Sequence, residues 1–246
     1  SGNVLLESGT GTQTVNTSVG SGTGHLTLKS AGALGLSAGV TVSTTGSGSV
    51  ALRSSGAAVT MGLTSTITTV DGDIEVVSGG VSHDVTIAAL TASNATVAVV
   101  ATGNIAEAGA VTEITANAAF LSAGGNVGLA ANPLELAVAD LAISAGGAAG
   151  LFVINSGDLN IGAVSAGALV VGTDAVAAAS ARSGSGLMAS AGALVTRVSD
   201  GALSTDTSAV GLIDAAGNIL PETTERAEGT ARDPDITLSE TLEAEG

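Results

Sequence analysis

The sequence predicts an all-β fold, a parallel β-helix (β-solenoid) with about three short strands in each turn of about 22–24 residues. Three observations predict it. A glycine, a turn-prone polar residue and an apolar-x-apolar triplet recur along the chain; hydrophobic residues make up 45% of it; and aromatic residues make up only 1%. An interior with almost no rings has to be narrow, and stacked turns of short aliphatic strands provide such an interior.

The recurring phrase sets the predicted length of a turn. Its first spacings are 22, 24 and 24 residues, and the later spacings of 31, 22 and 32 indicate insertions or degenerate turns, with Ser93-Asn94-Ala95 as a weak copy. Glycine accepts a positive φ freely, and Asn or Asp tolerates the left-handed region, so we expect each phrase at a corner of the coil. The phrases begin at Gly2, Gly24, Gly48, Gly72, Gly103, Gly125, Gly157 and Gly217.

The triplets within one repeat predict the strands. The third copy contains Val50-Ala51-Leu52, Val59-Thr60-Met61 and Ile67-Thr68-Thr69. In a strand with this alternation, successive side chains point alternately into the core and toward the outside. An antiparallel sandwich or barrel would also use short strands, with turn signals every eight to twelve residues or so. The long period of the whole pattern favours the parallel coil.

The same alternation assigns an inside and an outside to each strand. Leu28 is expected to point into the core and Thr27 to the solvent, so that Thr27→Asp should be mild and Leu28→Asp disruptive. One outward column is expected to contain, from turn to turn, Leu5, Thr27, Ala51, Glu75 and Ala106.

Two domains are predicted. Residues 1–220 form the β-solenoid repeat domain, and residues 221–246 form an acidic tail or linker with eight acidic and two basic residues and a possible isolated strand at 235–239. The segment Val164–Arg197 is rich enough in alanine for a helix, but its glycines and its Ala-Gly-Ala-Leu phrase favour keeping it in the coil.

The composition excludes several classes of partner. A formal net charge of −16, with six scattered basic residues, makes nucleic acid an improbable partner. The absence of Cys excludes disulfides and thiolate chemistry. No apolar run reaches the roughly 18 residues that a spanning helix requires, so no membrane insertion is expected. The N-terminus shows no signal peptide and starts inside a repeat, as expected of a processed or excerpted chain.

The acidic and histidine-containing stretches are interpreted as structural. Asp71-Gly72-Asp73, followed by Glu75, lacks the ligand series of known calcium loops, so solvated turn carboxylates are expected, although a weak calcium site near Asp71 and Asp73 stays open. His25 occupies a turn position that other copies fill with Asn, Ser or Asp.

The remaining polar candidates are similarly interpreted. His83 and Asp84 adjoin Ser82, but adjacency in sequence is not the spatial arrangement that hydrolysis needs. Asp84 and Asp158 are isolated acidic residues. We therefore predict no catalytic, cofactor-binding or metal-ligating residue, no cofactor and no enzymatic activity.

Two further function classes remain as alternatives. A surface- or ligand-binding solenoid for glycans or ice would need a regular outward array, which the mixed sizes and the charge of Glu75 spoil. A polysaccharide-active β-helix enzyme would need clustered carboxylates with basic residues, and is less favoured because the basic residues are scattered.

The repeated phrases "GNVLLESG", "GHLTLKSAG", "GSVALRSSG", "GDIEVVSGG" and "GDLNIGAVSAG" resemble the repeat regions of filamentous-haemagglutinin-like large repetitive bacterial surface adhesins. The resemblance covers about residues 1–220. It implies a right-handed parallel β-helix, export to the bacterial cell surface, and a role as stalk, fibre or adhesive rod. No functional residue of that family can be assigned to a position in this chain.

The two ends of the sequence suggest self-association. The repeat phrase begins at Gly2 with no capping helix before it. Beyond the acidic linker, the apolar-x-apolar pattern of a strand returns at residues 235–239. An uncapped parallel edge offers free backbone groups to a matching strand. We therefore expect head-to-tail assembly of copies of this chain into a fibre. The alternative is that the two ends stack on neighbouring repeats of a longer chain.

Overall fold

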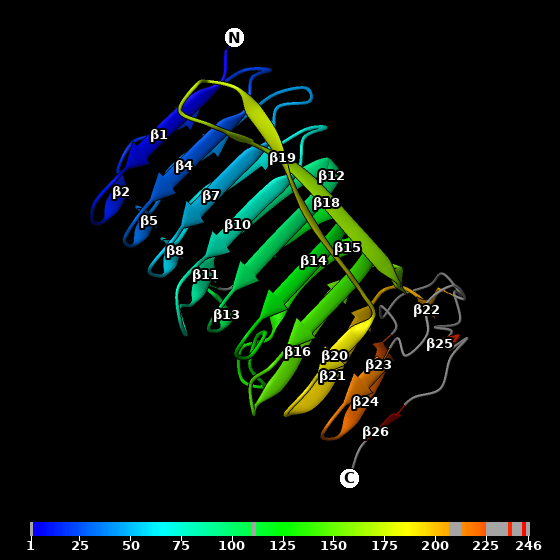
Figure 1. The fold of residues 1–246 in the computed structure, drawn as a ribbon. Coiled ribbons are helices and arrows are strands. Elements are labelled where there is room, and N and C mark those ends of the chain that lie inside the picture. Colours follow the sequence, from blue (N-terminus) through cyan, green and yellow to red (C-terminus); the bar gives the residue numbers. More distant parts are fainter. Residues whose placement is uncertain (1, 110–111, 207–212, 225–235, 238–242, 245–246) are drawn as a thin grey trace.

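The alternating triplets form short parallel strands that stack turn upon turn. The third repeat provides β7 (Val50–Ser54), β8 (Val59–Met61) and β9 (Thr66–Thr69), which confirms three strands in a turn. In this computed structural model, which describes residues 2–109, 112–206, 213–224, 236–237 and 243–244, the strands form a β-solenoid of about nine turns without a helix (Figure 1). The predicted fold class is confirmed.

The first face of the coil is a parallel sheet in constant register. Val4, Leu26, Val50 and Ile74 follow one another in one inward column, and Val97 continues it. Its early strands are β1 (Val4–Ser8), β4 (Leu26–Ser30), β7, β10 (Ile74–Ser78) and the later parts of β12 (Ala89–Ala101), β14 (Ile114–Ala123) and β15 (Leu134–Ala145). It continues as β17 (Leu159–Ile161), β20 (Leu187–Ala189), β22 (Leu203–Thr205), β23 (Ile213–Ala215), β25 (Ile236–Thr237) and β26 (Glu243–Ala244).

The second and third faces complete each turn. The second face contains β2 (Gln13–Val15), β5 (Leu34–Leu36), β8, β11 (Val85–Ile87) and β13 (Ile105–Glu107). After the bridged residue Val127 it continues in the first residues of β16 (Gly150–Ser156), β21 (Ala193–Ser199) and β24 (Ile219–Thr224). The third face contains β3 (Val19–Gly20), β6 (Thr41–Ser43), β9 and the early parts of β12, β14 and β15, and it continues in the later parts of β16, β21 and β24. In β12, β14 and β15 the third and first faces share one long strand, and the pairing of β12 with β14 is irregular between Ala92 and Thr96.

The core is the narrow aliphatic interior that the composition predicts. Leu26 and Leu28 are fully buried in it, and so are most inward Val, Ile and Leu residues of the other turns. Neither phenylalanine belongs to this core: Phe120 packs in a separate apolar cluster outside the coil, and Phe152 is half-buried. Stacked positions recur about every 4.8 Å, so rings would overfill the interior.

The corner glycines are needed for a reason other than the expected one. Gly24 and Gly72 do not adopt a positive φ. A Cβ at either position would instead collide with the backbone of the corner glycine one turn earlier. The tight stacking of successive turns therefore requires glycine here.

The repeat phrases do not all mark the same corner. Gly24, Gly48 and Gly72 precede first-face strands, but Gly103-Asn104 leads into β13, which pairs with β11 on the second face. The weak copy Ser93-Asn94-Ala95 takes the first-face corner before Val97. The long spacing after Gly72 thus reflects a change of corner, and Ala106 does not belong to the predicted outward column.

The prediction that Val164–Arg197 stays in the coil is wrong for most of that segment. Residues 163–185 leave the first face after Ile161 and form an antiparallel hairpin of β18 (Ala163–Val171) and β19 (Ala177–Ser185). Gly172 and Val176 close its turn by a backbone hydrogen bond. The chain re-enters the coil at β20. The hairpin runs lengthwise over the outside of the first face (Figure 1).

The C-terminal part stacks on the preceding turns where the structure describes it. β24 continues through Pro221 to Thr224 in register with β21. In the predicted tail strand 235–239, Ile236–Thr237 form β25, which pairs with Leu203 and Ser204 of β22. The other residues of that strand, and 225–234 of the predicted linker, lie outside the described residues.

Candidate functional site

Three glutamates from two successive turns meet at one corner of the coil. Glu107 is the last residue of β13, Glu113 immediately precedes β14, and Glu135 lies in β15. Glu113 and Glu135 are neighbours across the stack: the Glu113 N–H donates to the Glu135 carbonyl, and the Glu135 N–H donates to Glu113 Oε2, both at 2.8 Å. One carboxylate oxygen of each residue lies within 4.8 Å of the other two.

Glu107 replaces an aliphatic residue of the core. β13 continues the second-face stack, in which the third residue of every earlier three-residue strand is buried and apolar. Those residues are Val15, Leu36, Met61 and Ile87. In β13 the third residue is Glu107, opposite Ile87. A carboxylate in an aliphatic column is costly unless something compensates its charge.

The three carboxylates, hereafter the glutamate cluster, are enclosed. Glu113 is completely buried, at 0% exposure, and Glu107 and Glu135 are half-buried. Glu113 Oε1 and Glu135 Oε2 are buried without a hydrogen-bond partner. None of the ion pairs among the described residues includes a member of the cluster. The cluster thus lacks a basic side chain that would balance it.

The surroundings favour the protonated form of the cluster. Burial is the largest cause that raises the pKa of Glu113 to about 9. A side-chain hydrogen bond with Glu135 and the charges of Glu135 and Glu107 act in the same direction, against the hydrogen bond from the Glu135 backbone. Burial, followed by the charge of Glu135, also raises the pKa of Glu107. In the absence of a cation, Glu113 therefore holds a proton at neutral pH.

This ionisation predicts a loss of stability as the pH rises from 4.5 to about 9 when divalent cations are chelated. Between pH 4.5 and about 9 the folded chain keeps the Glu113 proton and the unfolded chain has lost it, so stability falls as the pH rises. The slope reaches up to about 1.4 kcal/mol per pH unit. Glu113→Gln should flatten it, as measured by urea unfolding followed by far-UV circular dichroism. Asp71→Asn is the matched control, and an equally steep slope in Glu113→Gln would contradict the assignment.

A second feature, the docked hairpin, rests on an apolar strip outside the coil. Alternate residues of β18 are buried, beginning with Val164, Ala166 and Ala168. Val164 and Ala166 pack with Ala98, Phe120 and Ala142 in a cluster separate from the core. This strip lies along β12, β14 and β15 of the first face, and Phe120 is the only ring in the cluster.

Hydrogen bonds and an ion pair join the rest of the hairpin to the first face. The Gly167 N–H donates to Asp73 Oδ2 at 2.6 Å, and the Val171 N–H donates to Thr27 Oγ1 at 2.9 Å. Arg182 donates to Glu75 Oε1 from Nε at 3.2 Å and from Nη2 at 3.1 Å. Arg53 Nη2 lies 3.4 Å from the same oxygen.

The hairpin overturns two expectations about the outward column. Thr27 and Glu75 point outward as predicted, but both are completely buried, because β18 and β19 cover them. Glu75 is therefore an ion-paired carboxylate and not a solvated one. Thr27→Asp is no longer expected to be mild, since it would place a carboxylate beneath the hairpin.

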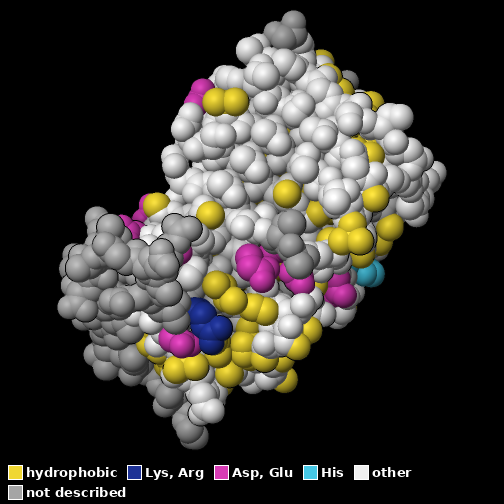
Figure 2. Space-filling model, turned by 180° about the vertical axis from the view of Figure 1, so that it is seen from behind, with side chains coloured by type: hydrophobic (Ala, Val, Ile, Leu, Met, Phe, Trp, Pro, Cys, Tyr) yellow, Lys and Arg dark blue, Asp and Glu magenta, His cyan; other side chains and the backbone are white. Residues whose placement is uncertain are grey.

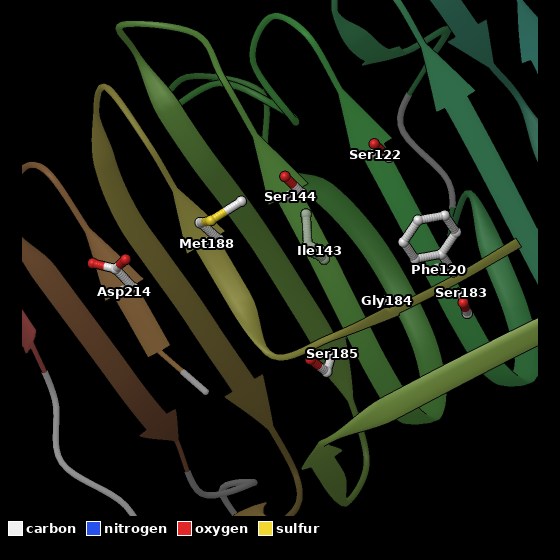
Figure 3. Close-up of a pocket in the computed structure, with 9 residues that line it drawn as sticks. All are labelled: Phe120, Ser122, Ile143, Ser144, Ser183, Gly184, Ser185, Met188 and Asp214. Carbon is white, nitrogen blue, oxygen red and sulfur yellow. The ribbon is translucent and has the colours of Figure 1, made fainter. Parts of the chain in front are cut away.

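A hollow of about 440 Å³ opens beside the base of the hairpin. In Figure 3, Phe120 and Ser122 from β14 and Ser144 from β15 lie beside it, with Met188 beyond them. Ile143 also borders it, although its side chain belongs to the core of the coil. Ser183, Gly184, Ser185 and Asp214 complete its lining. The side chains that line it include one ring, one thioether, several hydroxyls and a single carboxylate.

The remaining residues singled out in the sequence have identifiable structural contacts. His25 Nδ1 accepts a hydrogen bond from the Ser49 N–H of the next turn, and Asp84 Oδ1 accepts from the Asn104 N–H. Asp158 Oδ1 accepts from the Ala202 N–H. The His83 carbonyl accepts from Ser78 Oγ. These contacts join successive turns or close corners, and none of them is specific to catalysis.

The stretch considered as a calcium loop is also structural where described. Asp71 Oδ1 accepts from Asn94 Nδ2, and Asp73 Oδ1 accepts from the Thr96 N–H. Within the described residues, the carboxylates of Asp71, Asp73 and Glu75 do not converge as potential ligands, whereas those of the glutamate cluster do. The sequence carried one signal for the cluster: Glu113 and Glu135 are 22 residues apart, one period of the repeat.

The face seen from behind in Figure 2 is poor in basic side chains. Acidic side chains gather near its middle, and basic side chains form one small group lower down. No helix among the described residues has the length and hydrophobicity that a membrane crossing needs.

The fold defines the class of protein: the chain is a β-solenoid repeat protein with a hairpin docked on its first face. Comparison with protein-family models, curated proteins and solved structures returned no match. The resemblance to filamentous-haemagglutinin-like adhesins therefore stays a prediction.

Proposed function

We propose that the chain is a structural or adhesive module of a bacterial surface protein, an extracellular β-solenoid that assembles end to end into a fibre. The observation that supports this most is the constant register of the first face, in which each turn is the template for the next. Repetition of this kind builds an elongated and stiff body from small residues. The resemblance of the repeat phrases to surface adhesins supports the same function.

The docked hairpin adds to the stiffness that such a module needs. β18 contacts β4, β7, β10, β12, β14 and β15. In an ordinary solenoid each turn contacts only its neighbours, so single turns can unfold locally. A hairpin that spans several turns joins them into one cooperative unit, which suits a spacer under mechanical load.

The first turn supports assembly. Among the described residues, β1, β2 and β3 each pair with a strand on one side only. Gln13 donates its N–H to Ala33 of the next turn, so the N–H of Thr14 points toward the open side. The last turn of another copy, or a neighbouring repeat of a longer chain, would pair there. Because β25 and β26 pair with β22 and β23 of their own chain, this assembly does not require a tail strand that crosses the junction.

Proline at the open side tests the proposal. Leu5→Pro with Thr14→Pro removes two N–H groups that face away from β4 and β5, and leaves the native bonds of Val4 and Gln13 in place. At high concentration we expect filaments of the unmodified chain in electron micrographs and growing light scattering, and we expect the double variant to stay dispersed. Far-UV circular dichroism checks that both remain folded.

Two outcomes would overturn the assembly. One is an unmodified chain that remains a dispersed monomer at all concentrations. The other is filament formation by the folded double variant at the same rate as the unmodified chain, which would place the contact elsewhere.

A further inference from the structure

We propose that the glutamate cluster of Glu107, Glu113 and Glu135 is a binding site for a divalent cation, Ca²⁺, that clasps two successive turns of the solenoid. The proposal is independent of the function proposed above. It rests on the convergence of the three carboxylates and on the buried, unpartnered oxygen of Glu113.

The three side chains are placed as ligands and not as solvated surface charges. Glu113 is completely buried, and its Oε1 has no hydrogen-bond partner although Oε2 accepts the Glu135 N–H. Glu135 Oε2 is likewise buried and without a partner. Once the carboxylates are ionised, each of these oxygens is a buried acceptor without a donor, and a cation would satisfy both of them at once.

The position of Glu107 is the second argument. The corresponding inward residues of the four earlier second-face strands are apolar and buried. For stability alone, another aliphatic residue would serve better there. The single carboxylate in that column lies beside two others from the adjoining strands, which points to a common partner for all three.

The donor set and its dimensions favour Ca²⁺. Carboxylate oxygens are ligands for hard cations, and the cluster offers neither nitrogen nor sulfur. Calcium–oxygen distances of about 2.3–2.6 Å place oxygens on opposite sides of the ion about 4.6–5.2 Å apart. The ligand atoms here lie within 4.8 Å of one another. Mg²⁺ needs shorter distances and a stricter octahedron, so we expect weaker binding of that ion.

Charge balance agrees with this assignment. None of the ion pairs of the described chain reaches the cluster. Glu75, the other buried acidic residue with an unpartnered oxygen, has two arginines beside it. The two buried acidic sites of the solenoid are thus compensated differently, one by arginines and the other by a cation.

The test is a Ca²⁺ titration of the full chain after treatment with a chelator. Calorimetry should show one saturable site per chain, and Ca²⁺ should raise the temperature of unfolding. Glu113→Gln keeps an oxygen for the Glu135 N–H but removes a charge, so we expect affinity to fall about tenfold or more. Asp71→Asn, which removes a carboxylate from the other acidic stretch, should bind Ca²⁺ like the unmodified chain.

Several results would overturn the proposal. These are no saturable Ca²⁺ binding, unchanged binding by Glu113→Gln, equal loss of binding in Asp71→Asn, or tighter binding of Mg²⁺ than of Ca²⁺. If Glu113→Gln does not fold, Glu107→Gln at the half-buried edge of the cluster replaces it, with the same expected loss. Retained binding in that variant would equally contradict the site.

Discussion

Replacing Leu28 with Asp is expected to lower the free energy of unfolding by roughly 4 kcal/mol or more. Leu28 is completely buried, and it stacks between Leu6 and Leu52 of the neighbouring turns. A carboxylate at this position has no basic partner in the aliphatic interior. Since each turn is the template for the next, the damage should extend to both neighbours. Urea unfolding followed by circular dichroism measures the loss.

Thr60→Asp is the matched control for this substitution. Thr60 is the exposed middle residue of β8, between the buried Val59 and Met61. Its Asp variant should change the free energy of unfolding by less than about 1 kcal/mol. Equal losses in the two variants would contradict the alternation of inward and outward residues.

Replacing Arg182 with Met is expected to loosen the hairpin and leave the coil intact. The substitution leaves the buried Glu75 carboxylate with Arg53 alone, at 3.4 Å. Removing one partner of a buried ion pair costs several kcal/mol, and because Arg53 remains we expect about 2 kcal/mol, or about 30-fold easier opening. Hydrogen exchange at the Gly167 and Val171 amides, which donate to Asp73 and Thr27, reports this opening.

Arg197→Met is the control for the loss of an arginine. Arg197 pairs with Glu222, but their side chains are 44% and 38% exposed, so water already screens the pair. Exchange of the hairpin amides should be unchanged in this variant. Protection of Gly167 and Val171 that survives Arg182→Met would show that the Arg182–Glu75 ion pair is not needed to hold the hairpin.

Most of the fold can be predicted from the local sequence pattern and the repeat length. Triplets such as Val59-Thr60-Met61 specify inward and outward side chains through the two-residue period of a strand. The lack of rings specifies a narrow interior, and the repeat of 22–24 residues specifies three strands per turn. These properties depend on neighbours in sequence or on the next turn, and so they can be read without the structure.

The corner assignments and the course of the hairpin required the tertiary structure. The phrase at Gly103 has the same pattern as that at Gly24, a glycine, a polar residue and an aliphatic residue, but it turns the chain into the second face. Residues 163–185 keep the alternation of a strand in either environment, so the pattern cannot distinguish a turn of the coil from a hairpin above it. Only packing against Ala98 and Phe120, far away in sequence, decides between the two.

For the candidate sites, too, some features can be predicted from the sequence and others depend on the tertiary structure. The sequence by itself determined that the chain is acidic, free of Cys and built of stacked strands, and it placed Glu113 and Glu135 one period apart. The tertiary structure alone decided that Glu107 joins them and that Glu75 meets an arginine 107 residues later in the chain. The physical reason is that strand alternation specifies which side of a strand a residue faces, whereas burial of an outward residue depends on which distant segment covers it.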